Sequence, residues 1–219
     1  MPFARFSRVV LVFGVAVLLG SLAVPAKAAT TTYDTNNTPY TGGTINPGDT
    51  VLLNNGAAVT GNVVANGTLQ FNQTEVLVIS NTISGTGTLS LTNTGTLDLN
   101  SSNAVVLDMT TTASSGLLQI NSGNGNLTVG NSGTGALNVT GGSVTNYVGN
   151  LGVSVGSVGT ATVSSGTWAN GQNLYIGDSG TATLNVTGGY VSNSTGYIGT
   201  NAGSVGTVTV TSGTFTTGA

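Results

Sequence analysis

A 47-residue internal repeat constrains this chain more than any other feature of its sequence. Residues 127–172 align without a gap with residues 174–219, and more than half of the aligned positions are identical. The segment LTVGNSGTGALNVTGGSVTN (127–146) returns as LYIGDSGTATLNVTGGYVSN (174–193). Because one unit of this kind cannot bury its apolar face alone, successive units must stack on one another. The repeat therefore predicts a solenoid.

A weaker half-repeat divides each unit. An aliphatic residue followed by glycine recurs at Val129-Gly130, Leu151-Gly152, Ile176-Gly177 and Ile198-Gly199, so the half-units alternate between 22 and 25 residues. Lengths of about 20–25 residues match one solenoid coil. Each half-unit contains runs of alternating apolar and polar residues that end at Gly-Gly or Ser-Gly turns. We expect an all-β chain whose coils supply two or three short strands, each paired with its equivalent about 4.8 Å along the axis.

Four valines at equivalent positions form the expected interior ladder of the regular repeats: Val139, Val163, Val186 and Val210. Adjacent strand residues face opposite ways, so the neighbours of these valines should point outward. These neighbours are Asn138, Thr162, Asn185 and Thr209, and the repeat also aligns Trp168 with Phe215. The glycines between the runs are expected at corners, where a positive φ or a close backbone approach is needed.

The repeat is less regular upstream, where GTLQF (67–71), GTLSL (87–91) and GTLDL (95–99) keep a turn followed by alternation. We divide the chain after its leader into an entry coil or cap (29–60), irregular coils (61–126) and two regular repeats (127–173 and 174–219). The sequence ends just before the next expected aliphatic-glycine pair, which indicates a truncated array with an open strand edge. We expect this open C-terminal edge to promote self-association.

Residues 1–28 have the pattern of a secretory signal peptide. Arg5 and Arg8 form a positive segment, an apolar run covers 9–22, and Ala26-Lys27-Ala28 is a small-residue cleavage pattern. Cleavage is predicted after Ala28. A transmembrane anchor is the alternative, but the apolar run ends before Pro25 and falls short of the ~20 residues that a span needs.

Disorder is an alternative for a chain in which 35 of 219 residues are glycine and 4% are charged. Disordered segments combine low hydrophobicity with high net charge, whereas 38% of these residues are hydrophobic and many recur at fixed spacing. All three basic residues precede the predicted cleavage site. Because Lys and Arg dominate affinity for nucleic acid and anionic lipid, we expect the mature chain to bind neither. The sequence has no cysteine, so no disulfide forms.

Few side chains are suited to catalysis, since the chain has no His, no Cys and no basic residue after Ala28. Asp98 and Asp108 are the one pair of acids in the coil region that could act on a glycosidic bond, although outward strand or corner positions explain both. Calcium needs six or more oxygen ligands, and Asp178 is matched by Asn131 one unit earlier, so a calcium-loaded solenoid is not expected. We predict no catalytic residue, no metal and no cofactor.

The Thr-x-Thr pattern occurs at 160–162, 181–183 and 207–209. Stacked on a flat face, such threonines could match an ice lattice. The preference of threonine for strands explains the pattern equally well, so both interpretations stay open.

The segment VANGTLQFNQTEVLVISNTISGTGTLSLTNTGTLDLN (64–100) resembles the β-strand repeats of bacterial autotransporter passenger domains. The 47-residue unit resembles the repeat shared by type V secretion and PEP-CTERM-associated proteins, and together these cover nearly all of the mature chain. The resemblance implies a Gram-negative source, a right-handed parallel β-helix, and display on or release from the outer surface.

These features predict an exported structural or adhesin-like passenger that binds host or bacterial surface glycans or proteins through a distributed polar surface. We expect membrane attachment only through a translocator that this chain does not contain, because a barrel needs many ~10-residue alternating strands with aromatic girdles. The chain has five Phe, six Tyr and one Trp. The alternative is a carbohydrate-active β-helix enzyme or a carbohydrate-binding solenoid.

Overall fold

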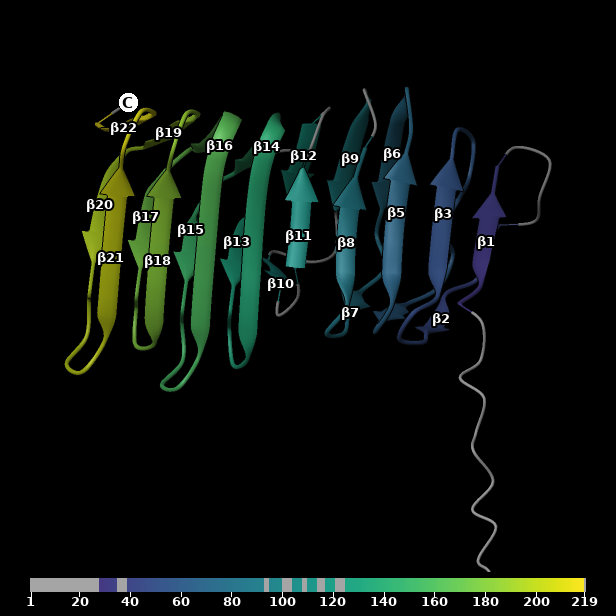
Figure 1. Ribbon diagram of the computed structural model, residues 1–219, viewed down its shortest axis with the longest axis horizontal. Coiled ribbons are helices and arrows are strands. Elements are labelled where there is room, and N and C mark those ends of the chain that lie inside the picture. Colours follow the sequence, from purple (N-terminus) through teal and green to yellow (C-terminus); the bar gives the residue numbers. More distant parts are fainter. Residues whose placement is uncertain are drawn as a thin grey trace, which may run out of the picture.

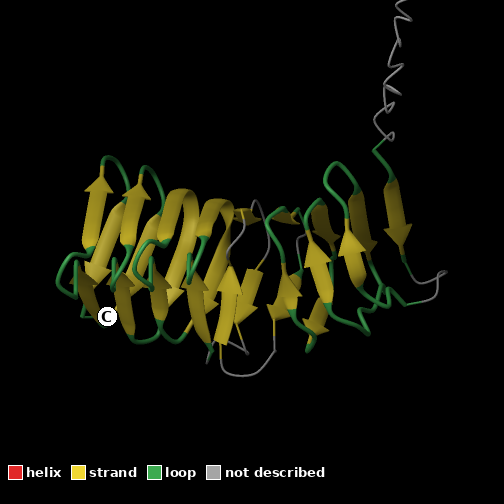
Figure 2. Cartoon of the chain, turned by 90° about the horizontal axis from the view of Figure 1, so that it is seen from below, coloured by secondary structure: helices red, strands yellow, loops and turns green. Residues whose placement is uncertain are grey.

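The computed structural model describes residues 28–34, 39–92, 95–99, 104–107, 110–113, 117–120 and 125–218. The regular elements of this part of the chain are all β-strands, stacked in successive coils (Figure 2). It follows that no helix in it has the length and hydrophobicity needed to cross a membrane. Equivalent strands of neighbouring coils pair in parallel. The predicted all-β parallel solenoid is confirmed.

The strands lie on three faces. The first face consists of β1 (Thr30–Tyr33), β3 (Thr50–Asn54), β5 (Thr68–Asn72), β8 (Thr88–Leu91), β11 (Thr110–Ala113), the first parts of β14 (Thr134–Asn146) and β16 (Val158–Asn170), β18 (Thr181–Val186) and β21 (Val205–Val210). The second face consists of β6 (Val76–Ile79), β9 (Thr96–Leu99), β12 (Leu117–Ile120), the second parts of β14 and β16, β19 (Tyr190–Asn193) and β22 (Thr214–Thr217).

The third face is made of two separate sheets. The N-terminal sheet holds β2 (Gly43–Ile45), β4 (Val63–Ala65) and β7 (Ile83–Ser84). The other holds β10 (Ala104–Leu107), β13 (Asn126–Val129), β15 (Gly149–Leu151), β17 (Asn173–Ile176) and β20 (Thr195–Ile198). In Figure 1 the chain climbs the first face, crosses over the top and descends behind while advancing from right to left, which makes the solenoid right-handed.

The half-repeat spacing reappears on the third face. Val129 pairs with Leu151, Leu151 with Ile176, and Ile176 with Ile198, at separations of 22, 25 and 22 residues. Each aliphatic-glycine pair found in the sequence therefore marks the end of one third-face strand, and each half-unit is one coil.

The N-terminal segments continue the same stack. The entry segment 29–60 supplies β1, β2 and β3, and Thr30 of β1 pairs with Thr50 of β3. In the irregular part, GTLQF and GTLSL lie on the first face as β5 and β8, and Thr68 pairs with Thr88. GTLDL lies on the second face as β9, so the three similar motifs do not occupy equivalent positions.

The interior is filled by ladders of aliphatic side chains. On the first face Val51, Leu69 and Leu89 stack in register and are buried. Fully burying such a side chain stabilises the fold by about 1.5–3 kcal/mol. The largest fully buried side chains are Trp168 and Phe71. Stacking therefore supplies the core that a single coil cannot make.

Candidate functional surface

The ladder of four valines predicted from the repeat joins the first-face strands of four coils. Val139 pairs with Val163, Val163 with Val186, and Val186 with Val210. The first three side chains are fully buried, whereas Val210 is 45% exposed. Val210 is exposed because β21 pairs with β18 alone among the described strands. These valines serve the core, so groups that meet a ligand must lie on the outward side.

Positions that pair in register on the first face form two rows along the solenoid axis, and the side chains described in these rows face outward. The first row is Thr30, Thr50, Thr68, Thr88, Thr110, Ala136, Thr160, Thr183 and Thr207. The second row is Thr32, Leu52, Gln70, Ser90, Thr112, Asn138, Thr162, Asn185 and Thr209. Threonine occupies every position of the first row except Ala136. Polar outward positions therefore recur in the described coils on both sides of β11.

The Thr-x-Thr patterns do not all coincide with these two rows. Those at 160–162 and 207–209 fill both rows, whereas the pattern at 181–183 is displaced by two residues. Thr183 pairs with Thr160 and Thr207, and Asn185 takes the second-row position. The alignment of the internal repeat did not reveal the upstream half of the first row, which runs from Thr30 to Thr88. The threonine after glycine in GTLQF and GTLSL is the signal that could have revealed it.

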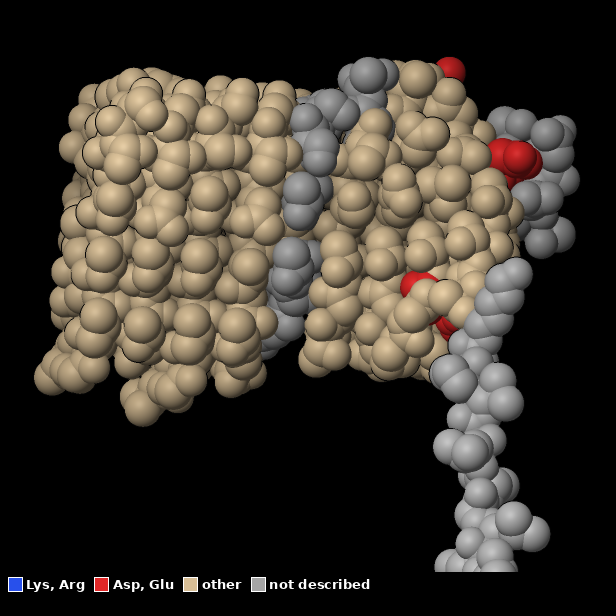
Figure 3. Space-filling model, viewed as in Figure 1, with Lys and Arg blue, Asp and Glu red and all other residues tan. Residues whose placement is uncertain are grey.

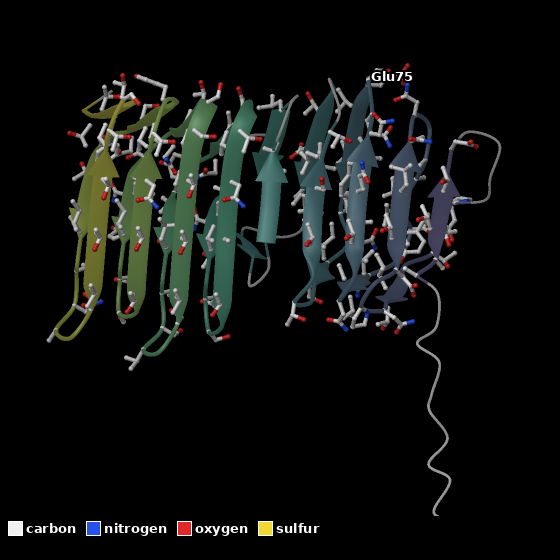
Figure 4. All side chains as sticks on the ribbon, viewed as in Figure 1. Glu75 is labelled. Atoms are coloured by element: carbon white, nitrogen blue, oxygen red, sulfur yellow. The ribbon has the colours of Figure 1, made fainter. Side chains whose placement is uncertain are left out.

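The described residues contain no Lys or Arg, and their acids lie mainly in the N-terminal coils. On the first face in Figure 3, acidic atoms appear toward the N-terminal end and leave the C-terminal coils bare. Asp49 Oδ1 accepts a 2.9 Å hydrogen bond from the Ala29 amide. Glu75 lies in the exposed turn between β5 and β6, at the top of the stack in Figure 4. The charge of the described chain is thus concentrated at one end.

Of the two acids considered for glycosidic chemistry, Asp98 lies in the described part of the chain. Asp98 lies in β9 between the buried Leu97 and Leu99, so alternation directs it away from the interior. It is nevertheless covered and only 4% exposed, and its backbone pairs with Val78 of the preceding coil. Asp108 lies outside the described residues.

A chain of buried amides runs between coils beside the single tryptophan. Trp168 Nε1 donates a 2.7 Å hydrogen bond to Asn146 Oδ1, and Asn146 Nδ2 donates one of 2.7 Å to Asn170 Oδ1. Asn170 Nδ2 in turn donates to the Ser192 carbonyl at 3.2 Å. Asn193 is fully buried, and its amide has no hydrogen-bond partner in the described part. These buried hydrogen bonds link the second-face strands of successive coils.

The tyrosines of the C-terminal coils lie outside the first-face strands. Tyr175 of β17 and Tyr197 of β20 stack on the third face with ring centroids 4.7 Å apart and an interplanar angle of 8°. The rings cover each other's faces along the axis. Tyr190 of β19 shares a 3.0 Å hydrogen bond with the Thr216 hydroxyl. The inner ring faces of the stacked pair are therefore occupied by the protein itself.

No group of three or more His, Cys, Asp or Glu in the described ranges is arranged to hold a metal ion. At Asp178, the amide Nδ2 of Asn201 donates to Oδ1 and to the backbone carbonyl, both at 2.9 Å, and also to Ser179 Oγ at 3.0 Å. An amide from the next coil thus contacts this carboxylate.

The predicted leader falls mainly outside the described residues. Ala26 lies outside the described residues, whereas Ala28 is exposed and lies two residues before β1 begins. Ala29 already contacts the stack, because its amide donates to Asp49 Oδ1 and its carbonyl accepts a 2.7 Å hydrogen bond from the Thr50 amide. Cleavage after Ala28 stays a prediction.

Comparison with known proteins identifies no relative. No protein-family model matches the chain, and no curated protein and no solved structure matches it. The resemblance to autotransporter-associated repeats therefore stays a prediction based on the residues quoted above.

Proposed function

We propose that this chain is an exported structural or adhesin-like solenoid, a non-catalytic passenger segment displayed on or released from the surface of a Gram-negative bacterium. The observation that carries the proposal is the pair of outward rows, in which Thr, Asn, Ser and Gln recur from coil to coil. Such a surface offers many similar weak contacts. Binding of surface glycans or proteins would then be spread along the stack.

Export is tested in the source bacterium by adding protease to intact cells. We expect the protein to be degraded on the cells or found in the medium, with Ala29 as its first residue. A Leu18→Arg change in the apolar run should keep the chain inside with its leader intact, because a charge interrupts the segment that export requires. Wild-type protein that stays in the cytoplasm with its leader attached would contradict the proposal.

The non-catalytic part of the proposal is tested separately with purified protein and a panel of neutral and acidic polysaccharides. We expect no release of reducing or unsaturated ends. Turnover of any of these glycans that Asp98→Asn abolishes would show that the chain is an enzyme, because a carboxylate at that position would then be required.

A further inference from the structure

Four C-terminal coils present a two-dimensional lattice of outward side chains on β14, β16, β18 and β21. One row holds Ala136, Thr160, Thr183 and Thr207, and the other holds Asn138, Thr162, Asn185 and Thr209. Strands in such a sheet lie about 4.8 Å apart, and alternate residues along one strand lie about 6.6 Å apart. We call Thr160, Thr162, Thr183, Thr207 and Thr209 the threonine array.

The fold does not use the hydroxyl groups of the threonine array. Within the described residues, none of the five makes a side-chain hydrogen bond, although all are half-buried or exposed. Hydroxyl groups nearby behave differently, because Ser212 donates to the Thr187 carbonyl at 2.6 Å and Thr216 donates to the Val191 carbonyl at 3.4 Å. The array therefore keeps a regular set of hydroxyl groups for a partner on the solvent side.

The strands that carry the array are uncharged. No Asp, Glu, Lys or Arg occurs in β14, β16, β18 or β21, and this part of the first face shows no charged atoms in Figure 3. A charged group holds its hydration water strongly, because removing a charge from water is costly. On a neutral lattice of hydroxyl and methyl groups, the hydration water can instead adopt the arrangement of an adjacent crystal surface.

A sugar ligand fits this face less well. Aromatic rings with a free face pack against sugar rings, but these first-face strands direct no aromatic side chain outward, since the indole of Trp168 in β16 is fully buried. The tyrosines of the C-terminal coils lie outside these strands, and Tyr175 and Tyr197 cover each other. The array consists of small side chains at regular spacing.

We propose that the threonine array binds ice. Prism faces of hexagonal ice repeat their oxygen atoms in two directions at distances close to the two spacings of the array. Water held by the hydroxyl groups and ordered around the methyl groups can therefore join the crystal. The inference assigns ice, in place of glycans or proteins, to the C-terminal part of the distributed surface, and rests on the proposed function for its extracellular setting.

The test measures freezing-point depression without melting-point depression, and incorporation of the purified full chain into slowly grown ice. Thr183→Lys places a long charged side chain at the centre of the array. Thr145→Lys is the matched control, because Thr145 is also half-buried and outward but lies in the second-face part of β14. We expect wild type and Thr145→Lys to arrest ice growth and enter the ice, and Thr183→Lys to lose both properties.

Circular dichroism and thermal melting show whether each variant is folded. If Thr183→Lys unfolds, Thr207→Lys takes its place, because Thr207 is exposed on the last coil. Folded wild type without ice activity overturns the inference, as does equal activity in all variants. Binding to insoluble cellulose or chitin that Thr183→Lys abolishes, with no effect on ice, also overturns it. None of these outcomes bears on protease accessibility of the chain on cells, which tests the proposed function.

Discussion

At the scale of single residues, Trp168 is fixed by a buried hydrogen bond as well as by packing. Asn146 bridges Trp168 Nε1 and Asn170 Oδ1 through two bonds of 2.7 Å. Asn146→Ala leaves both groups buried without this partner, and each unpaired group costs about 1–3 kcal/mol. We expect the free energy of unfolding to fall by about 2–6 kcal/mol. Urea denaturation followed by the fluorescence of Trp168, the single tryptophan, measures the change.

Thr145→Ala is the control for this prediction. Thr145 precedes Asn146 in β14 but points outward and is half-buried. The free energy of unfolding should change by less than about 0.5 kcal/mol, as for most surface substitutions. If both variants lose the same stability, the amide bridge is not the cause.

Tyr40 makes the N-terminal coils sensitive to alkaline pH. Burial, and then the neighbouring Tyr33, raise the pKa of the Tyr40 phenol above its ordinary value of 10.0. The folded chain therefore favours the neutral phenol, and this contribution to stability is complete below pH 10 and is lost as pH rises through the folded-state pKa. We expect Tyr40→Phe to weaken the fall of melting temperature above pH 10. An unchanged alkaline slope would contradict this assignment.

At the scale of elements, glycine permits the corner between the third face and the first face. Gly177 follows β17 with a φ of +77°, and a Cβ there would overlap the carbonyl oxygen of Val205 in a neighbouring coil. Gly203 has a φ of +83° but open space around the Cβ position. Gly203→Ala should cost about 1–2 kcal/mol for the left-handed conformation alone. Gly177→Ala should cost about 1–3 kcal/mol more because of the overlap.

Thermal and urea denaturation of the two alanine variants separate the conformational cost from the steric cost. Equal destabilisation by Gly177→Ala and Gly203→Ala would mean that the corner accommodates a methyl group by shifting the next coil.

The regular coils could be predicted because identical residues 47 positions apart occupy equivalent places. The upstream first row could not be found with a fixed period, since the separation of paired residues grows from 18 at Thr50 and Thr68 to 26 at Thr110 and Ala136. The buried Asn146 was missed because asparagine usually faces solvent. Its position two residues after the inward Val144 was a usable signal, because strand residues two apart share a side.

The doubled glycines show the same limit. Gly141 and Gly142 were expected to be a corner between strands, but they lie inside β14, where the pairing with β16 shifts register. The equivalent Gly188 and Gly189 do separate β18 from β19. Sequence therefore located the bend in both coils, whereas backbone pairing across the bend depends on the neighbouring coil.

At the scale of the whole molecule, the C-terminal end of the described stack is an apolar edge. β21 and β22 each pair with one strand among the described elements, and Ile198, Val205 and Val210 are about half exposed. Unpaired parallel edges with little charge promote association between chains. We therefore expect a protein that consists of this 219-residue chain, freed of its leader, to sediment as an oligomer at micromolar concentration.

Val210→Lys should restore the monomer, because it places a charge at the end of the interior ladder, where burial against a second chain becomes costly. Val155→Lys is the matched control, since Val155 is 88% exposed in the loop between β15 and β16 and remote from the edge strands in sequence. It should leave the oligomer unchanged.

Hydrogen exchange supplies the second measurement. Residues 197–218 should exchange faster in the Val210→Lys monomer than in the wild-type oligomer, because association protects the last coil. A wild-type monomer whose last coil is as protected as β16 would contradict the prediction. It would show that the edge is stable by itself and that no association exists for a charge at position 210 to prevent.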